Sequence, residues 1–326
     1  MWRVTSMVEA WAEKRVVISP DPSTLADAVA ARFLNRVAKR VDEGKLAHVS
    51  LTGGSMGSAV LAAAARSRRI EKIDWSRVHF WWSDERFVAK TDDDRNEKQA
   101  RAALLDALDV PAENIHAAPA SDEGLDLDAA AAAHADELAR FAGSEGPWPS
   151  FDVCFLGVGP DGHIASLFPD RPEILVTDRS VLGVRDSPKP PPERLTMTRP
   201  VINSSKRVWM VIAGADKASA LGLALAGASY ASVPAAGAKG RKRTIFFVDE
   251  AAAANVPPSS STASTDSGSR SLKTREADAS ASASLVGVCR RQSWPRRSRS
   301  CLSASSRRAS ASSSVRRSFT YARCVL

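Results

Sequence analysis

The sequence predicts an α/β protein whose sheet is mostly parallel and is covered by helices on both faces. Over residues 1–254, short apolar runs rich in β-branched or aromatic residues alternate with longer stretches of helix-forming residues. The apolar runs are nearly continuous, which is typical of parallel strands buried on both faces. Ligands of such sheets bind beyond the carboxyl ends of the strands, so the residues after each strand are the candidates for a site.

Seven strands and five helices are expected. The strands are RVVIS, HVSLT, RVHFWWS, FDVCFLG, RSVLGV, RVWMVIAG and RTIFFVD. The helices are LADAVAARFLNRVAKRV, which Pro22-Ser23 opens, then SAVLAAAARS, RNEKQARAALLDAL, DAAAAAHADELARFA and DKASALGLALAG. Strands that alternate with helices form right-handed βαβ units.

The net charge of +8 is unevenly distributed along the 326 residues. Residues 255–326 hold 13 Lys+Arg and 3 Asp+Glu, which leaves 32 basic and 34 acidic residues in the rest of the chain. A near-neutral body does not support a phosphate-backbone footprint on the folded part. Nucleic acid is therefore not an expected partner, since only the tail is basic.

We expect a boundary at residue 257, with a folded body over 1–257 and a Ser/Arg-rich basic tail over 258–326. The tail has too little apolar surface to offset the entropy of ordering it. The composition changes abruptly after VDEAAAANVP, which favours an artefact of the reading frame. A solvated extension without a partner and a disordered basic arm that contacts nucleic acid are the alternatives.

The sequence indicates a cytoplasmic protein without a metal site. No apolar run approaches the roughly 18 residues that span a bilayer, and the N-terminus lacks the apolar stretch of a signal peptide. Met7 is an alternative start. Three of the four cysteines lie in the tail and Cys154 lies inside an apolar strand, so neither a zinc site nor a disulfide framework is predicted.

The turn GGSMGS follows the second predicted strand. Gly53 and Gly54 permit close approach of the backbone to a ligand, and the N-terminus of the next helix offers free N–H groups to a phosphate. Ser55 and Ser58 add hydroxyl donors. The alternative is a tight turn without a ligand.

Charged side chains follow the third predicted strand in SDERFV. Arg86 can bind a phosphate or carboxylate through two hydrogen bonds, and Asp84 and Glu85 can bind hydroxyls or orient Arg86. The alternative is a structural ion pair at the rim of the sheet. Asn96 is expected at the N-cap of the next helix.

His163 is the one histidine of five that lies in a glycine-rich turn after a strand, in FDVCFLGVGPDGHIASLFP. An imidazole titrates near neutrality and suits a general base. Asp161, two residues earlier, can hold the ring or bind a sugar hydroxyl. A helix-capping role for His163 is the alternative.

Two basic residues farther along are candidates for phosphate contacts. Arg194 follows a proline-rigidified loop in PKPPPERLTMT, and Lys217 begins a helix in GADKA. A lysine there can reach a phosphate as a point charge, and a solvent-facing lysine is the commoner alternative. The cluster KGRKR before the last strand is either a solvated face or part of an anionic-substrate rim.

Taken together and in this order, the motifs resemble the 6-phosphogluconolactonase family. The matching features are GGS, W-x-DER, the Asn-led helix, G-V-G-x-DGH-x-ASLFP, PKPPPERLTMT, GxDKA and FFVDEAAA, and they run from about Val16 to Pro257. The family belongs to a superfamily with glucosamine-6-phosphate isomerase/deaminase. This resemblance implies a Rossmann-like three-layer α/β/α sandwich.

The resemblance also implies hydrolysis of 6-phospho-D-glucono-1,5-lactone to 6-phosphogluconate, a step of the oxidative pentose phosphate pathway, without a metal or organic cofactor. We assign His163 as the base and Asp161 as the residue that orients it or positions substrate. The candidates for substrate and phosphate contacts are Gly53, Gly54, Ser55, Asp84, Arg86, Arg194 and Lys217. The oligomeric state stays undetermined.

Three other functions are weighed against the lactonase. The isomerase/deaminase branch ends the His turn in Asn-Glu-Pro, whereas this chain has Leu167-Phe168-Pro169 and so lacks the acid. A non-catalytic sugar-phosphate-binding protein would not need His163. A nucleic-acid-binding protein would act through the tail, with an affinity that falls steeply with salt.

Overall fold

The computed structural model describes residues 14–256. The predicted tail, the alternative start Met7 and the tail cysteines lie outside the described residues. No helix in the described range is long and apolar enough to cross a bilayer.

A six-stranded sheet forms the centre of the described part, in the order β1-β9-β8-β5-β2-β3, and every neighbouring pair is parallel. The parallel sheet predicted from the sequence is therefore confirmed. Its strands are β1 (Lys14–Ser19), β2 (Ala47–Leu51), β3 (Val78–Trp82), β5 (Val153–Gly157), β8 (Arg207–Ile212) and β9 (Arg243–Asp249).

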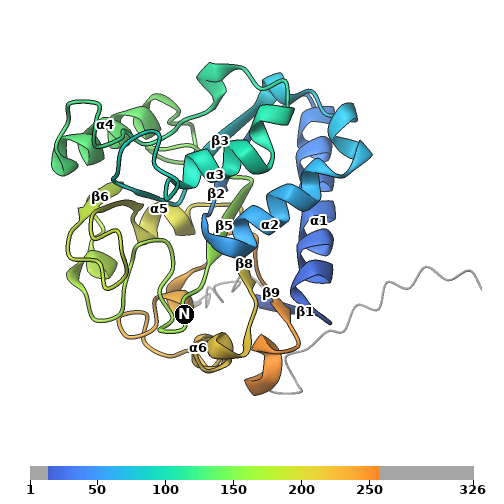
Figure 1. Cartoon of the computed structure of the whole chain (residues 1–326), viewed down its shortest axis with the longest axis vertical. Helices are drawn as coiled ribbons and strands as arrows, with labels where there is room; N and C mark the ends of the chain where they lie inside the picture. Colours follow the sequence, from blue (N-terminus) through green and yellow to red (C-terminus); the bar gives the residue numbers. More distant parts are fainter. Residues whose placement is uncertain (1–13, 257–326) are drawn as a thin grey trace, which may run out of the picture. The chain divides into compact units, whose positions relative to one another are not determined.

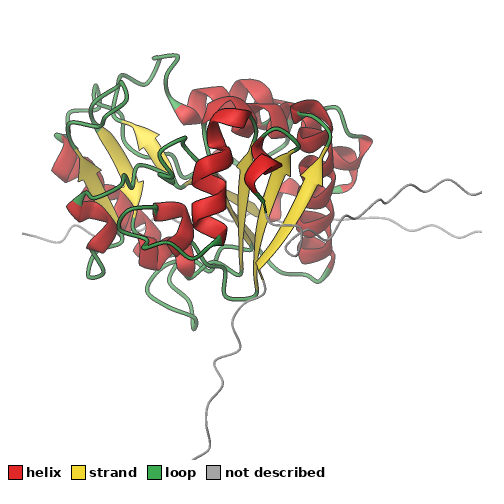
Figure 2. Ribbon diagram, turned by 90° about the horizontal axis from the view of Figure 1, so that it is seen from below, coloured by secondary structure: helices red, strands yellow, loops and turns green. Residues whose placement is uncertain are grey.

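Helices cover both faces of this sheet (Figures 1 and 2). They are α1 (Pro22–Asp42), α2 (Gly54–Ala65), α3 (Asn96–Ala103), α4 (Leu127–Arg140), α5 (Arg199–Asn203) and α6 (Ala218–Leu225). Successive strand residues point to opposite faces. Phe155 and Trp209 accordingly pack in one core with α1 and α2, while Cys154 and Met210 pack in the other.

A second, antiparallel sheet lies beside the first (Figure 2). It contains β4 (Asp84–Arg86), β7 (Arg194–Met197) and β6 (Val181–Val184), in the order β4-β7-β6. The sequence predicted β6 but missed β4 and β7, because both are short and begin or end with a charged residue. This sheet brings Arg86 directly opposite Arg194.

The N-terminus of α3 differs from the prediction. Arg95, not Asn96, occupies the N-cap position, and Asn96 is the first helical residue. The carboxylate of Glu85 replaces the expected cap by accepting hydrogen bonds from the backbone N–H groups of Asn96 (2.7 Å) and Glu97 (2.8 Å). An acid from a neighbouring strand thus satisfies the helix N-terminus and leaves the side chain of Asn96 available for other contacts.

Four histidines form one cluster between β3 and α4. His48 stacks on His79 at 4.7 Å between ring centroids, and Nδ1 of His79 lies 3.0 Å from Nε2 of His116. Trp81 stacks on His116 at 3.8 Å, and His134 lies beyond Trp81. Burial lowers the pKa of His48 to about 3 and those of His79 and His134 to about 4.

The cluster makes stability depend on pH. In the unfolded chain these histidines titrate near 6.5, so below that pH the unfolded state binds protons that the folded state does not. We expect the free energy of unfolding to fall between about pH 6.5 and about pH 4. Burial raises the pKa of Glu85 to about 7, so this group increases the free energy of unfolding as the pH falls. It is one titrating group against three histidines, and the histidines dominate.

Urea unfolding at about pH 7 and about pH 5 measures the effect. Substitution His79→Phe removes one titrating group, so its loss of stability over this interval should be smaller than that of the parent. Equal stability at both values in the parent would contradict the prediction.

Candidate active site

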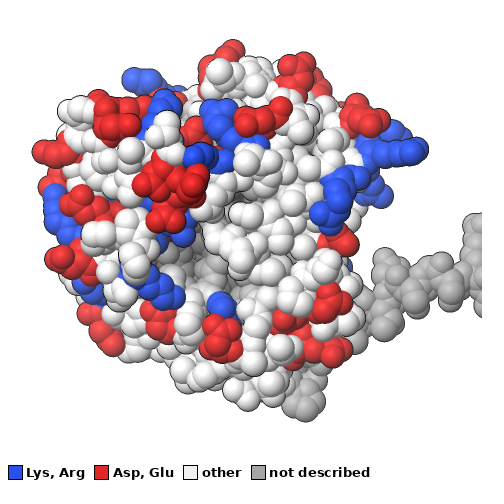
Figure 3. Space-filling model, viewed as in Figure 1, with Lys and Arg blue, Asp and Glu red and all other residues white. Residues whose placement is uncertain are grey.

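A cavity of about 400 Å³ opens at the carboxyl ends of the strands. Residues from the turns after β2, β5 and β8 and from both strands of the β4–β7 pair line it. Basic and acidic side chains are interspersed over the face shown in Figure 3, where they surround a hollow near its centre. The position agrees with the rule that parallel sheets bind ligands beyond their carboxyl ends.

The turn after β2 forms one wall. Gly54 has φ of +79°, which glycine adopts without strain. A Cβ atom on Gly53 would overlap the side chain of Asn96, so this glycine allows α3 to approach the turn. Both glycines line the cavity, but Ser55 is exposed on the first turn of α2 and does not.

His163 lies in the turn after β5 and its ring reaches the cavity. Nδ1 of His163 lies 2.5 Å from Oδ1 of Asp161. Because a carboxylate only accepts hydrogen bonds, this contact places the proton on Nδ1 and leaves the Nε2 lone pair available. Asp161 is not part of the cavity wall, which is consistent with a role in holding the ring.

Glycine at position 159 makes room for this pair. A Cβ there would overlap both the imidazole of His163 and the carboxylate of Asp161. The turn is further fixed by hydrogen bonds from the N–H of Gly159 to the carbonyl of His163 (3.0 Å) and from the N–H of Gly162 to the carbonyl of Gly159 (2.9 Å). The spacing Gly-x-Asp-Gly-His therefore has a steric explanation.

The environment of His163 favours its neutral form. Burial lowers the pKa of the imidazole, and Asp161 opposes this shift through its hydrogen bond and charge. Burial raises the pKa of Asp161, but the hydrogen bond and charge of His163 outweigh it, so the net shift is downward. At neutral pH the pair is thus a neutral imidazole held by an ionised carboxylate.

Arg194 and Asp84, from the β4–β7 pair, also line the cavity. The guanidinium of Arg194 donates hydrogen bonds to the carbonyls of Lys189 (2.9 Å) and Pro190 (3.0 Å) and lies 4.0 Å from Oδ2 of Asp84. Asp84 also accepts a 2.8 Å hydrogen bond from the hydroxyl of Ser166. Arg194 therefore fixes the proline-rich loop as well as lining the cavity.

Asn96 is held against Arg86. Its Oδ1 accepts a hydrogen bond from the Arg86 guanidinium, and its Nδ2 donates to the carbonyl of Asp84 at 2.8 Å. Nε of Arg86 is buried and has no hydrogen-bond partner among the described residues. Asn96 thus holds Arg86 in place at the cavity wall.

Two lysines complete the cationic lining. Lys217, from the turn after β8, forms a 2.8 Å ion pair with Asp216. Lys189 lines the cavity from the proline-rich loop, and its charge lowers the pKa values of both His163 and Asp161. Sequence reasoning missed Lys189, although a basic residue in a loop stiffened by prolines was a usable signal.

The cavity brings together most of the residues expected at the site. Those that line it are Gly53, Gly54, Asp84, Arg86, His163, Arg194 and Lys217. Other polar or glycine residues of the wall were not predicted as site residues from the sequence, and they include Thr52, Asn96, Gly157, Gly159 and Lys189. Over residues 14–256, no three His, Cys, Asp or Glu side chains are grouped to hold a metal ion.

The sequence matches a family model described as glucosamine-6-phosphate isomerases/6-phosphogluconolactonase over residues 20–247. The chain belongs to this family. Within it, the chain is 47% identical over 249 residues to a 6-phosphogluconolactonase of Streptomyces coelicolor, covering 75% of this chain and 95% of the relative. It is 48% identical over 244 residues to a 6-phosphogluconolactonase of Mycobacterium leprae, covering 74% and 98%.

Solved structures of this family share the fold. A 6-phosphogluconolactonase of Thermotoga maritima superposes with a TM-score of 0.63 at 27% identity, over 73% of this chain and all of the other. The Trypanosoma brucei enzyme gives 0.65 at 26% identity, over 75% and 99%. A monomeric glucosamine-6-phosphate deaminase gives 0.62 at 19% identity, over 74% and 99%, and this likeness concerns the fold alone.

Proposed function

We propose that the chain hydrolyses 6-phospho-D-glucono-1,5-lactone to 6-phospho-D-gluconate, a step of the oxidative pentose phosphate pathway. The observation that carries the proposal is a neutral His163, oriented by Asp161, in a cavity lined by four cationic side chains. The high identity to 6-phosphogluconolactonases over almost their whole length supports the same reaction.

His163 acts as the general base. With Nδ1–H bound to Asp161, Nε2 takes a proton from a water molecule, and the water oxygen attacks the lactone carbonyl carbon. The tetrahedral intermediate then collapses, the bond from that carbon to the ring oxygen breaks, and the imidazolium returns the proton to the ring oxygen. A δ-lactone is an activated ester, so no protein nucleophile is required.

The cations divide between two anionic groups of the reacting substrate. Lys189 is the cation whose charge acts on the His163–Asp161 pair, so we place it nearest the oxyanion that forms beside the base. Arg86 and Arg194 face each other across the β4–β7 pair and suit a phosphate. Lys217 and the Gly53-Gly54 turn are further candidates for the phosphate.

Phe168 argues against the deaminase alternative. Its buried ring packs on His163 at 4.8 Å between centroids, at the position where the deaminase branch carries a glutamate. An apolar ring cannot supply the second acid or base that ring opening and isomerisation require. We also propose that residues 1–257 suffice for activity, because the family match ends at residue 247.

The function is tested by measuring the hydrolysis of freshly made 6-phosphogluconolactone through the protons that the reaction releases. We expect rapid turnover by the full chain and by the chain truncated after Pro257. Substitution His163→Ala should reduce kcat/KM by about 10²–10⁴-fold, the usual contribution of a general base. Turnover at the spontaneous rate by the full chain, or release of ammonia from glucosamine 6-phosphate, would contradict the proposal.

The pH profile tests the pairing with Asp161. Since burial lowers the pKa of His163, the acid limb of log kcat/KM should bend below about pH 6.5. Substitution Asp161→Asn removes a charge that raises this pKa, so the bend should move to still lower pH while the rate at neutral pH falls. A bend that moves upward in Asp161→Asn would contradict the assigned role.

The steric role of Gly159 gives an independent prediction. Substitution Gly159→Ala should displace the His163 ring and reduce kcat by about a hundredfold, with little change in KM because the phosphate contacts lie elsewhere. Gly143→Ala is the matched control, because its Cβ would meet nothing within 4 Å. Parent-like kcat for Gly159→Ala would show that the turn tolerates a side chain there.

A further inference from the structure

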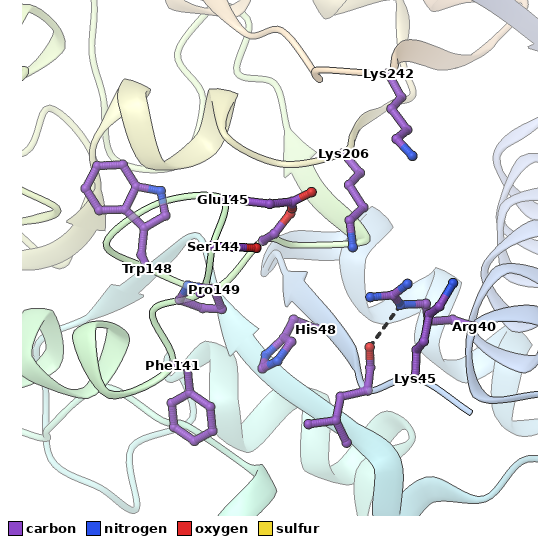
Figure 4. Close-up of a pocket in the computed structure, with 13 residues that line it drawn as sticks. Arg40, Lys45, His48, Phe141, Ser144, Glu145, Trp148, Pro149, Lys206 and Lys242 are labelled. Atoms are coloured by element: carbon purple, nitrogen blue, oxygen red, sulfur yellow. Dashed lines mark hydrogen bonds between the residues drawn. The ribbon is translucent and has the colours of Figure 1, made fainter. Parts of the chain in front are cut away.

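A second cavity, of about 530 Å³, opens at the amino ends of the strands (Figure 4). His48 in β2 and Lys206, just before β8, lie on its wall. The same two strands end at the candidate active site. β2 has five residues and β8 has six, and a strand rises about 3.3 Å per residue. The two cavities therefore lie one strand length apart, at opposite ends of the sheet.

Cationic groups converge in this cavity. Figure 4 shows the side chains of Arg40, Lys206 and Lys242 directed toward one region. Lys206 is 8% exposed and Nζ is held 3.0 Å from Asp152, which also lies 3.3 Å from Nε of Arg40. These two contacts with the carboxylate of Asp152 therefore hold Arg40 and Lys206 in place.

Few carboxylates remain to neutralise these cations. Glu145 lines the cavity, but it lies 2.6 Å from Arg241 and is thus already paired. Lys242 forms no ion pair with the residues that the structure describes. Lys45, at the rim, pairs with Glu43 at 3.0 Å. The cations outnumber the acids, which favours an anionic ligand.

His48 adds a donor to the same wall. The indole N–H of Trp81 donates to Nδ1 of His48 at 3.3 Å, so the neutral ring carries its proton on Nε2. His48 is only partly buried and lines the cavity. An N–H group and three cations together form a donor set that matches phosphate oxygens.

Aromatic side chains also line the cavity. The indole N–H of Trp148 donates to the hydroxyl of Ser204 at 2.8 Å, which restrains the ring. Phe141 packs edge-on against His48 at 5.8 Å between centroids. The loop between them is closed by two 3.2 Å hydrogen bonds between Gly143 and Gly146. Both rings therefore offer apolar surface at fixed positions on the wall.

We propose that this cavity is a second ligand site that binds a nucleotide, with its phosphates among Arg40, Lys206 and Lys242 and its base against Trp148 and Phe141. The cavity is larger than the candidate active site and falls in the usual range for small-molecule sites. Aromatic surface beside convergent cations suits a ligand that carries both a flat ring and phosphate. The hydroxyl of Ser144 offers a hydrogen-bond partner for the hydroxyls of a ribose.

Calorimetric titration of the full chain with ADP tests the proposal, with pyrophosphate and adenosine as separate arms. We expect ADP to bind more tightly than pyrophosphate, and adenosine to bind weakly. Charge reversal in Lys242→Glu, an exposed position, should weaken ADP binding by roughly tenfold. Trp148→Ala should weaken binding of ADP but leave that of pyrophosphate unchanged.

Lys217→Glu is the matched control, because it reverses a partly exposed charge at the other cavity and should leave ADP binding unchanged. Thermal melts check that each variant is folded. The proposal fails if ADP does not bind at millimolar concentration, or if Lys242→Glu binds it as the parent does. It also fails if Lys217→Glu abolishes binding, which would place ADP at the candidate active site. Equal affinity for ADP and pyrophosphate would exclude a nucleotide as the ligand.

Discussion

The hydrogen bond between Asp161 and His163 is the contact on which the proposed chemistry depends, and the surrounding fold accommodates it. The pair needs a turn at the carboxyl end of β5 without a Cβ at position 159, and Gly159 satisfies this requirement. The ring of Phe168 then packs on the imidazole and excludes water from one side. A neutral, oriented histidine results from these local constraints, and no metal ion is invoked to activate water.

The two sheets divide the work of building the site. The parallel sheet delivers the glycine turns after β2 and β5, because its strands all end at the same edge. The antiparallel sheet places Arg86 and Arg194 opposite each other on neighbouring strands. Glu85 connects them to the helical layer by capping α3, whose first residue, Asn96, contacts both Arg86 and the Gly53 turn. Base and cations therefore come from separate parts of the fold.

Sequence patterns predicted the parallel sheet and its principal helices, since long buried runs and helix-forming stretches report directly on burial. They missed β4 and β7, because strands of three and four residues are too short to show a periodicity, and β4 consists of charged residues alone. Asn96 was assigned a local capping role because its contacts to Arg86 and Asp84 depend on tertiary packing. His163 was found because its position after a strand is visible in sequence, whereas the cavity at the amino ends of the strands arises from residues scattered from Arg40 to Lys242.

The most direct test of the account is the tautomer and pKa of His163, measured by ¹⁵N NMR of the imidazole in the full chain, with His163→Gln to assign the signals. The account predicts a neutral ring at neutral pH with the proton on Nδ1, a pKa below about 6.5, and loss of this tautomer preference in Asp161→Ala. A proton on Nε2 at neutral pH, or a ring already charged there, would contradict it, because neither form leaves Nε2 free to accept a proton from water.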